Sequence, residues 1–184
     1  MAINLQKGQR QNINAPKFTI GLGWDANNSS TGGQFDLDAS IFGLSDSKKL
    51  VDDSFFVYYN NLQTPDKSIT HTGDNLTGDG DGDDEQIKID LTGIDGRVKE
   101  IIVVVTIHEA DSRNQNFGQV RNSFIRIFNT ETNEEILKYE LDEDFSIETA
   151  VEFGRVYEKN GEWKFEAVGN GQREGLQKYL DLYN

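Results

Sequence analysis

Cysteine is absent from this sequence, and histidine is nearly absent. The chain contains no Cys, and its two His residues are His71 and His108. The lack of cysteine excludes disulfides, thiolate nucleophiles, iron–sulfur clusters and cysteine-bound zinc. Two histidines also argue against an imidazole-rich metal site or a histidine-dependent metallohydrolase. Oxygen is therefore the metal-ligating atom that this chain offers in quantity.

Long hydrophobic runs are also missing. The longest apolar run covers residues 101–105, far short of the ~20 residues that a membrane-spanning helix needs. The first residues, MAINLQKGQRQNIN, lack the basic stretch and apolar stretch of a secretory signal. We therefore expect a cytoplasmic protein that does not insert into a membrane.

Positive charge is scarce, with 18 Lys and Arg against 32 Asp and Glu and a formal net charge of −14. A nucleic-acid-binding protein carries the opposite sign, so we expect no nucleic-acid partner. The 35% hydrophobic content and 18 Gly are typical of a folded chain. The length of 184 residues predicts one domain over residues 1–184.

Short runs of Val, Ile, Phe, Tyr and Thr separated by Gly, Asn and Asp predict an all-β fold, and only 2 Pro occur. The expected strands are 18–24, 35–44, 55–59, 69–72, 86–91, 100–108, 123–128, 135–141, 149–158 and 163–168. One open sheet does not comfortably hold so many strands, so a β-sandwich of two packed sheets is predicted. Residues 109–115 are expected to form a short turn. A short C-terminal helix over 173–182 is expected to pack on a sheet edge.

Residues 35–41 alternate strictly between apolar and polar side chains. The core-facing positions are Phe35, Leu37, Ala39 and Ile41. Asp36 and Asp38 therefore share the opposite face, about 7 Å apart. In residues 101–107 apolar side chains occupy both the odd-numbered and the even-numbered positions, which predicts a central strand covered on both faces.

An acidic, glycine-rich segment, GDNLTGDGDGDDE, covers residues 73–85 without any Lys or Arg. Its acidic residues are Asp74, Asp79, Asp81, Asp83, Asp84 and Glu85. Two carboxylates ~5 Å apart repel by about 3 kcal/mol at an effective dielectric of ~20, and a divalent cation would relieve this repulsion. Calcium accepts six to eight oxygen ligands, and the glycines at 73, 78, 80 and 82 free the backbone to supply carbonyl oxygens.

A solvated surface turn is the alternative interpretation of this segment. The segment is not an EF-hand, because Asp84 stands where that motif needs Gly and Asp90 stands where it needs Glu. Oxygen donors elsewhere favour a cation: Asp36, Asp38, and the pair Asn60 and Asn61. We therefore expect calcium-binding loops at one end of the sandwich.

Other motifs give weaker indications. Paired carboxylates could serve a glycosidase, but these acids lie among Gly and Asn, whereas a proton-donating acid needs an apolar pocket. Neither histidine has a nucleophile motif beside it, and GLGWD at 21–25 lacks the spacing of a phosphate-binding loop. Trp24 is therefore expected in the core, with Asp25 exposed at the strand end. Two alternatives remain for Arg113, Arg121 and Arg126: they form an anion-binding patch, or each pairs with nearby acids.

Several strings in the same order resemble the TerD family of tellurite-resistance and general stress proteins. They are GLGWD, FDLDASIF, YNN, HTGDNLTGDGDGDDE, QNFGQVRNSFIRIFN and FGRVYEKNGEWKFEAVGNG. The resemblance implies a β-sandwich that binds two calcium ions. Carried over by position, the implied metal ligands are Asp25, Asp36, Asp38, Asn60, Gly73, Asp74, Asn75, Gly78, Gly80, Asp83, Asp84 and Glu85. Asp79 and Asp81 stand where the family pattern does not require an acid.

The resemblance also implies a role in resistance to tellurite and other stresses, with companion Ter proteins that include a membrane-embedded one. Without cysteine the chain cannot reduce tellurite through a thiol. Our hypothesis is a calcium-dependent interaction or scaffold module rather than an enzyme, cytoplasmic or peripheral at the inner face of the membrane. A glycan hydrolase and a calcium-bridged binder of a small anion or nucleotide-like ligand remain as alternatives.

Overall fold

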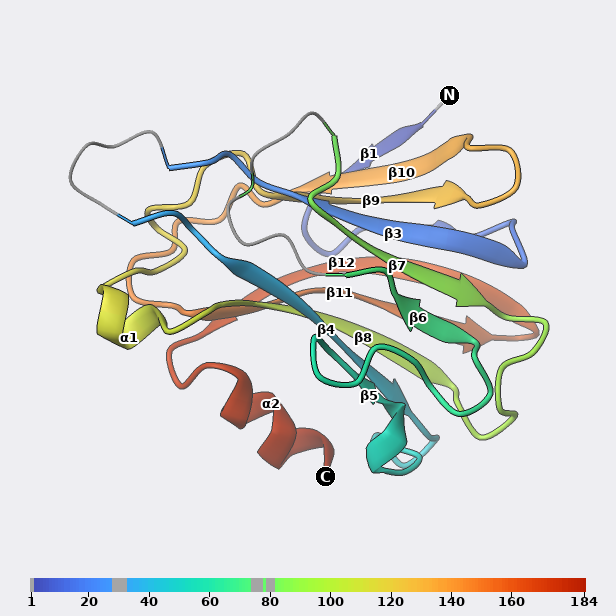
Figure 1. Ribbon diagram of the computed structural model, residues 1–184. Helices are drawn as coiled ribbons and strands as arrows, with labels where there is room; N and C mark the ends of the chain where they lie inside the picture. The colour runs from blue at the N-terminus through green and yellow to red at the C-terminus, as the bar shows by residue number, and fades with distance from the viewer. Residues whose placement is uncertain (1, 28–32, 74–77, 79–81) are drawn as a thin grey trace.

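The protein folds into two packed β-sheets, which confirms the predicted sandwich. A computed structural model describes residues 2–27, 33–73, 78 and 82–184. Sheet I has the order β1-β10-β9-β3-β7-β6, and sheet II has the order β2-β12-β11-β8-β4-β5. Figure 1 shows the two sheets as stacked layers.

Each predicted strand coincides with a strand of the structure, apart from small shifts at the ends. Sheet I contains β1 (Ile3–Leu5), β3 (Lys17–Gly23), β6 (Ile69–His71), β7 (Glu85–Asp90), β9 (Phe124–Asn129) and β10 (Glu135–Glu140). Sheet II contains β2 (Arg10–Asn12), β4 (Leu37–Leu44), β5 (Phe56–Val57), β8 (Glu100–Ile107), β11 (Ala150–Lys159) and β12 (Glu162–Gln172). The helices are η1 (Asp53–Phe55), α1 (Ala110–Arg113) and α2 (Leu176–Tyr183).

The first two strands were not predicted. β1 pairs in parallel with β10, with Ile3 opposite Leu137. β2 pairs antiparallel with β12, with Asn12 opposite Lys164. Each has three residues, too few to show a hydrophobic period, and each closes an edge of its sheet.

β8 is a central strand covered on both faces, as its sequence predicts. All eight of its residues are buried. Val103 and Val105 face the core between the sheets, whereas Ile102 and Val104 face the opposite way. Both faces of the strand therefore contribute to hydrophobic clusters.

Helix α2 packs on the outer face of sheet II, so the prediction that it covers a sheet edge was wrong (Figure 1). Tyr179 and Tyr183 join Phe42, Ile102 and Val104 in one hydrophobic cluster. The face attracts the helix because the outward residues of β4 and β8 are apolar and would otherwise be exposed. With eight residues α2 is too short to span a bilayer, and no other helix in the described part of the chain has the length and apolar character to do so.

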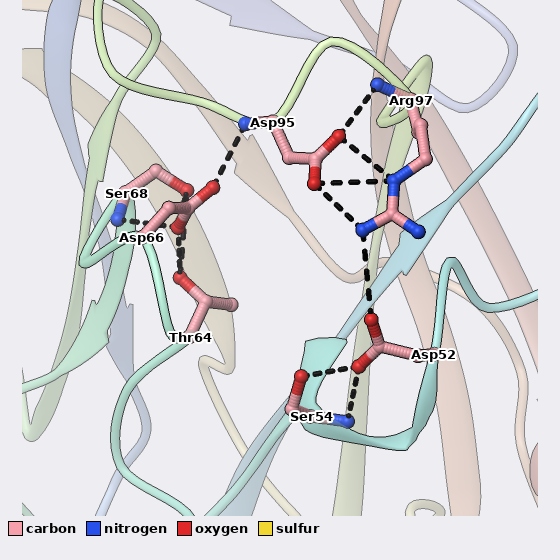
Figure 2. Close-up of polar contacts among 7 residues, drawn as sticks. All are labelled: Asp52, Ser54, Thr64, Asp66, Ser68, Asp95 and Arg97. Carbon is pink, nitrogen blue, oxygen red and sulfur yellow. Dashed lines mark hydrogen bonds and ion pairs between the residues drawn. The ribbon is translucent and has the colours of Figure 1, made fainter.

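A polar network joins three loops at the end of the sandwich where β7 finishes and β8 begins (Figure 2). The Asp66 carboxylate accepts hydrogen bonds from the hydroxyls of Thr64 and Ser68, both at 2.6 Å, and from the backbone N–H of Asp95 at 2.8 Å. Arg97 Nη2 lies 2.7 Å from Asp95 and 3.7 Å from Asp52, just before η1. These contacts link the three loops at the end of the sandwich opposite the start of β7.

Candidate metal centre

Glu85 joins the two sheets at the end of the sandwich where β7 begins. Its side chain is fully buried, and Oε2 accepts a 2.9 Å hydrogen bond from the backbone N–H of Ala39 on β4. β5 pairs with β4 only at Ile41 and Phe42, so the earlier part of β4 forms a sheet edge that faces sheet I. His71 Nε2 on β6 lies 3.4 Å from the same carboxylate oxygen. A buried carboxylate therefore lies in the seam between the sheets.

Asp36 and Asp38 lie at the start of β4 beside this seam. They alternate with core residues as predicted, but both are themselves buried, at 5% and 7% exposure. The Asp36 carbonyl accepts the backbone N–H of His108 at 2.8 Å. His108 Nδ1 lies 3.6 Å from Asp38 Oδ2. The Asp36 backbone and the Asp38 carboxylate therefore lie close to the end of β8.

Trp24 fixes the chain around Asp84 and Phe35. Its backbone N–H donates to Asp84 Oδ2 at 2.9 Å, and its indole Nε1 donates to the carbonyl of Phe35 at 3.1 Å. Trp24 is 4% exposed, which confirms its predicted place in the core. Gly78 lies against the indole, so closely that a Cβ there would come within 2.3 Å of Nε1.

Asp83 is directed away from the seam and pairs with Arg126 on β9. Arg126 Nε and Nη2 donate to its two carboxylate oxygens at 2.7 and 3.0 Å. The Asp83 side chain lies over Gly21, where a Cβ would come within 2.3 Å of the carboxylate. The Asp83 carboxylate raises the pKa of Arg126, with a smaller contribution from Glu135. Of the two alternatives for Arg126, pairing with acids is the one that the structure shows.

Three of the remaining predicted ligands, Asp25, Asn60 and Gly73, lie among the described residues. Asp25 is exposed, as predicted, and its Oδ2 accepts from Asn122 Nδ2 at 2.6 Å. Asn60 is exposed in the turn before Asn61. The backbone N–H of Gly73 donates to His71 Nδ1 at 3.1 Å. The predicted ligands Asp74, Asn75 and Gly80, together with Asp79 and Asp81, lie outside the described residues.

The chemistry of the seam suits a hard cation. Its acidic side chains offer carboxylate oxygens, the donors that calcium prefers, and burial makes their charge costly without compensation. Within residues 2–27, 33–73, 78 and 82–184, however, no three His, Cys, Asp or Glu side chains lie close enough together to hold a metal ion. The described carboxylates thus supply suitable donors but not a complete set of ligands.

Two features of this centre were not predicted from the sequence. His71 was expected to make an ordinary strand-end hydrogen bond, yet it also lies beside Glu85. Arg126 was expected to find an acid nearby, but its partner Asp83 is 43 residues away in sequence. The alternation of side chains in β6 and β7 could have suggested the contact between His71 and Glu85. His71 lies opposite Ile87, and Glu85 is two residues before Ile87 on the same face of β7.

Comparisons with known proteins agree with the sequence motifs. The model of the TerD domain family matches residues 1–183. The chain is 51% identical to "Tellurium resistance protein TerD" of Serratia marcescens, covering 100% of this chain and 97% of the relative. It is 48% identical to "General stress protein 16U" of Bacillus subtilis, with the same coverage. A solved homologue of telluride resistance protein from Streptomyces coelicolor, 20% identical, has the same fold with a TM-score of 0.69, covering 89% of this chain and 94% of that one.

Proposed function

The chain belongs to the TerD family of tellurite-resistance and general stress proteins, and we propose that it acts there as a calcium-dependent, non-catalytic interaction module. Relatives named for tellurium resistance and for general stress support the biological setting. The proposal concerns what this chain contributes to that setting, which is a surface formed when calcium binds.

The observation that supports calcium best is the contact between Glu85 and Ala39. It places a buried carboxylate from sheet I against the edge of sheet II, where Asp36 and Asp38 are also buried. Two calcium ions would be held by these carboxylates, Asp84 and the predicted ligands in residues 73–81. When bound, calcium neutralises carboxylate charge and cross-links the segments that carry it. This chain's own residues supply the framework, because Trp24 and Glu85 already hold the segments next to β4.

In this proposal Asp83 orders the loop through Arg126 and does not bind the cation. Both of its carboxylate oxygens face one guanidinium group, a strong bidentate arrangement. The same pair weakens the alternative of a calcium-bridged binder of a small anion. Arg126, one of the arginines of the expected anion-binding patch, already contacts Asp83 and Glu135.

We further propose that the partners are other Ter-type stress proteins, including a membrane-embedded one, and that the protein acts in the cytoplasm or at the inner face of the membrane. The calcium-loaded end of the sandwich would present the surface that a partner recognises. This role needs no chemical turnover, which is why we place the chain outside the enzymes.

A calcium titration of chelator-stripped protein tests the proposal. Calorimetry measures the binding heat, and the melting temperature is measured in parallel. Binding to the folded state adds about 2.7 kcal/mol of stability at a hundredfold excess over Kd. Asp38→Asn with Glu85→Gln should remove most of the binding heat and the thermal shift. A matched control, Asp46→Asn with Glu131→Gln, removes the same charge from two exposed positions and should bind calcium normally. An unchanged shift in D38N/E85Q would contradict these ligands, and an absence of heat in the wild type would contradict calcium binding altogether.

A further inference from the structure

The connection that enters β4 is held in place by donors from three other residues. Residues 33–36 belong to no strand, yet the carbonyl of each accepts a hydrogen bond. Gln115 Nε2 donates to the first two carbonyls, at 3.0 and 3.2 Å. Trp24 Nε1 donates to the third, at 3.1 Å, and the backbone N–H of His108 donates to the fourth, at 2.8 Å. Gln115 therefore helps to position the segment that ends in Asp36, one of the predicted metal ligands.

The Gln115 side chain also has an unused acceptor. It is 7% exposed, and among the described residues its Oε1 has no hydrogen-bond partner. The orientation of the amide follows from its two hydrogen bonds, because only the nitrogen can donate to a carbonyl. A buried oxygen without a partner is costly and is rare in folded proteins. An ion or a water molecule bound beside Gln115 would remove this cost.

The surroundings of Gln115 favour a cation over a water molecule. Asp36 is 5% exposed, and burial makes the charge of a carboxylate costly without compensation. Asp84 Oδ2 accepts the backbone N–H of Trp24 at 2.9 Å, and the indole of the same Trp24 holds the carbonyl next to Asp36. Both acids are thus linked to the segment that Gln115 holds. Their charge attracts a cation more strongly than a neutral molecule.

A side-chain amide oxygen is a ligand that calcium accepts. Calcium takes six to eight oxygen ligands, which include the carbonyls of Asn and Gln. Each further carboxylate would add repulsion between the ligands, whereas an amide oxygen adds a ligand without adding charge. The described acidic side chains do not form a complete set of ligands. A neutral oxygen beside them therefore supplies what the centre lacks.

We propose that Gln115 has two roles in the calcium centre. Its Oε1 is a neutral ligand of the ion that Asp36 also binds, and its Nε2 positions the segment that carries Asp36. The inference rests on the proposed calcium function and extends it to a residue outside the predicted ligands. Gln115 follows α1, which lies at the same end of the sandwich as the start of β4 (Figure 1). Calcium would therefore link the connection between β8 and β9 to β4.

Two substitutions separate the role of the oxygen from that of the nitrogen. Gln115→Met removes both polar atoms from a side chain of similar length, whereas Gln115→Glu keeps an oxygen and loses the N–H donors. Calorimetry follows the titration of each chelator-stripped, full-length variant with calcium. Gln115→Met should weaken at least one binding event by about tenfold or more. Gln115→Glu should bind calcium at least about fivefold more tightly than Gln115→Met, because it keeps the oxygen ligand and adds charge.

Gln119→Met is the matched control, because it makes the same change at an exposed position of the same connection. It should change the calcium affinity by less than about twofold. Equal losses in Q115M and Q115E would overturn the ligand role, since both variants lack the hydrogen bonds from Nε2. A wild-type affinity in Q115M would overturn the whole inference and leave the calcium proposal intact, because D38N/E85Q tests that proposal separately. An absence of binding heat in the wild type would overturn both.

A measurement on the wild type does not depend on how the variants fold. Uniform ¹³C and ¹⁵N labelling allows the Cδ resonance of each Gln side chain to be assigned through its own backbone. Calcium saturation should move the Cδ resonance of Gln115 and leave that of Gln119 in place. A Gln115 resonance that does not respond to calcium would overturn the assignment of Oε1 as a ligand.

Discussion

Glu85 and Ala39 connect the two sheets of the sandwich through a hydrogen bond of 2.9 Å between a buried carboxylate and a backbone N–H. The two residues are 46 positions apart in sequence and belong to different sheets. The contact satisfies an N–H group at an open stretch of β4 that would otherwise lack a strand partner.

Removal of the Glu85 side chain should therefore destabilise the protein even without calcium. Glu85→Ala leaves the Ala39 N–H unsatisfied and should lower the free energy of unfolding by about 1–3 kcal/mol. Glu85→Gln keeps an acceptor and should have a smaller effect. Urea unfolding in the presence of a chelator measures both variants. Equal losses in the two variants would show that the carboxylate charge, and not the hydrogen bond, matters.

Arg126 and Asp83 should be energetically coupled. Asp83 is 1% exposed at its side chain and Arg126 is 30% exposed, so loss of the cation leaves a buried carboxylate. We expect Arg126→Ala to cost about 2 kcal/mol, less than for a fully buried pair because of solvent screening. A double-mutant cycle with Asp83→Asn checks the coupling by chemical denaturation. Additive effects would mean that the pair contributes only through packing.

Glu152 should make stability fall as the pH rises. Burial raises the pKa of Glu152 in the folded protein above its ordinary value of 4.5, against the hydrogen bond from Tyr183. The folded state therefore holds this proton more tightly, and stability is lost as the pH rises from about 4.5 through the folded pKa. Glu152→Gln should be more stable than the wild type above this window and similar below it. Melting temperatures from acidic to neutral pH test the difference, and a constant difference would contradict it.

Tyr179 should anchor α2 through both its ring and its hydroxyl. The hydroxyl accepts the N–H of Glu152 at 3.0 Å and donates to the carbonyl of Asn170 at 2.9 Å. Tyr179→Phe should lower the free energy of unfolding by about 1 kcal/mol. Tyr179→Ala also loses the packing on Ile102 and Val104 and should cost about 3–5 kcal/mol. Thermal unfolding ranks the two variants, and equal losses would show that the ring contributes nothing.

Asp66 should stabilise the protein in a manner that is lost in acid. Burial favours its protonated form, but hydrogen bonds from Ser68, Thr64 and Asp95 outweigh burial and lower its pKa below 3.8. Its contribution is therefore complete above pH 3.8 and disappears as the pH falls through the folded pKa. Asp66→Ala should cost about 2 kcal/mol near neutral pH. The gap from the wild type should close in acid when followed by denaturant unfolding, and a gap that persists would contradict this account.

The sequence predicted the fold well where side-chain patterns are local. Residues 101–107 indicated β8, and the alternation from Phe35 to Ile41 placed Asp36 and Asp38 opposite the core face. Such patterns report which face is apolar, which depends only on neighbouring residues.

Features that depend on distant strands were not predictable in this way. α2 was expected at a sheet edge, because nothing in its own residues identifies Phe42 and Ile102 as the surface it covers. Strand register decides that Asp38 is buried and that Asp83 pairs with Arg126. The pattern of side chains along one strand does not show which residues of another strand lie beside it. β1 lacked a signal of its own and is defined by its pairing with β10.

The edge positions of β1 and β2 have a consequence for synthesis on the ribosome. Translation produces these strands well before their partners, which are β10 at Glu135–Glu140 and β12 at Glu162–Gln172. The nascent chain therefore carries β1 unpaired until β10 has emerged and β2 unpaired until β12 has emerged. A translation product that stops before β10 can complete neither sheet, because the strands that close one edge of each have nothing to pair with.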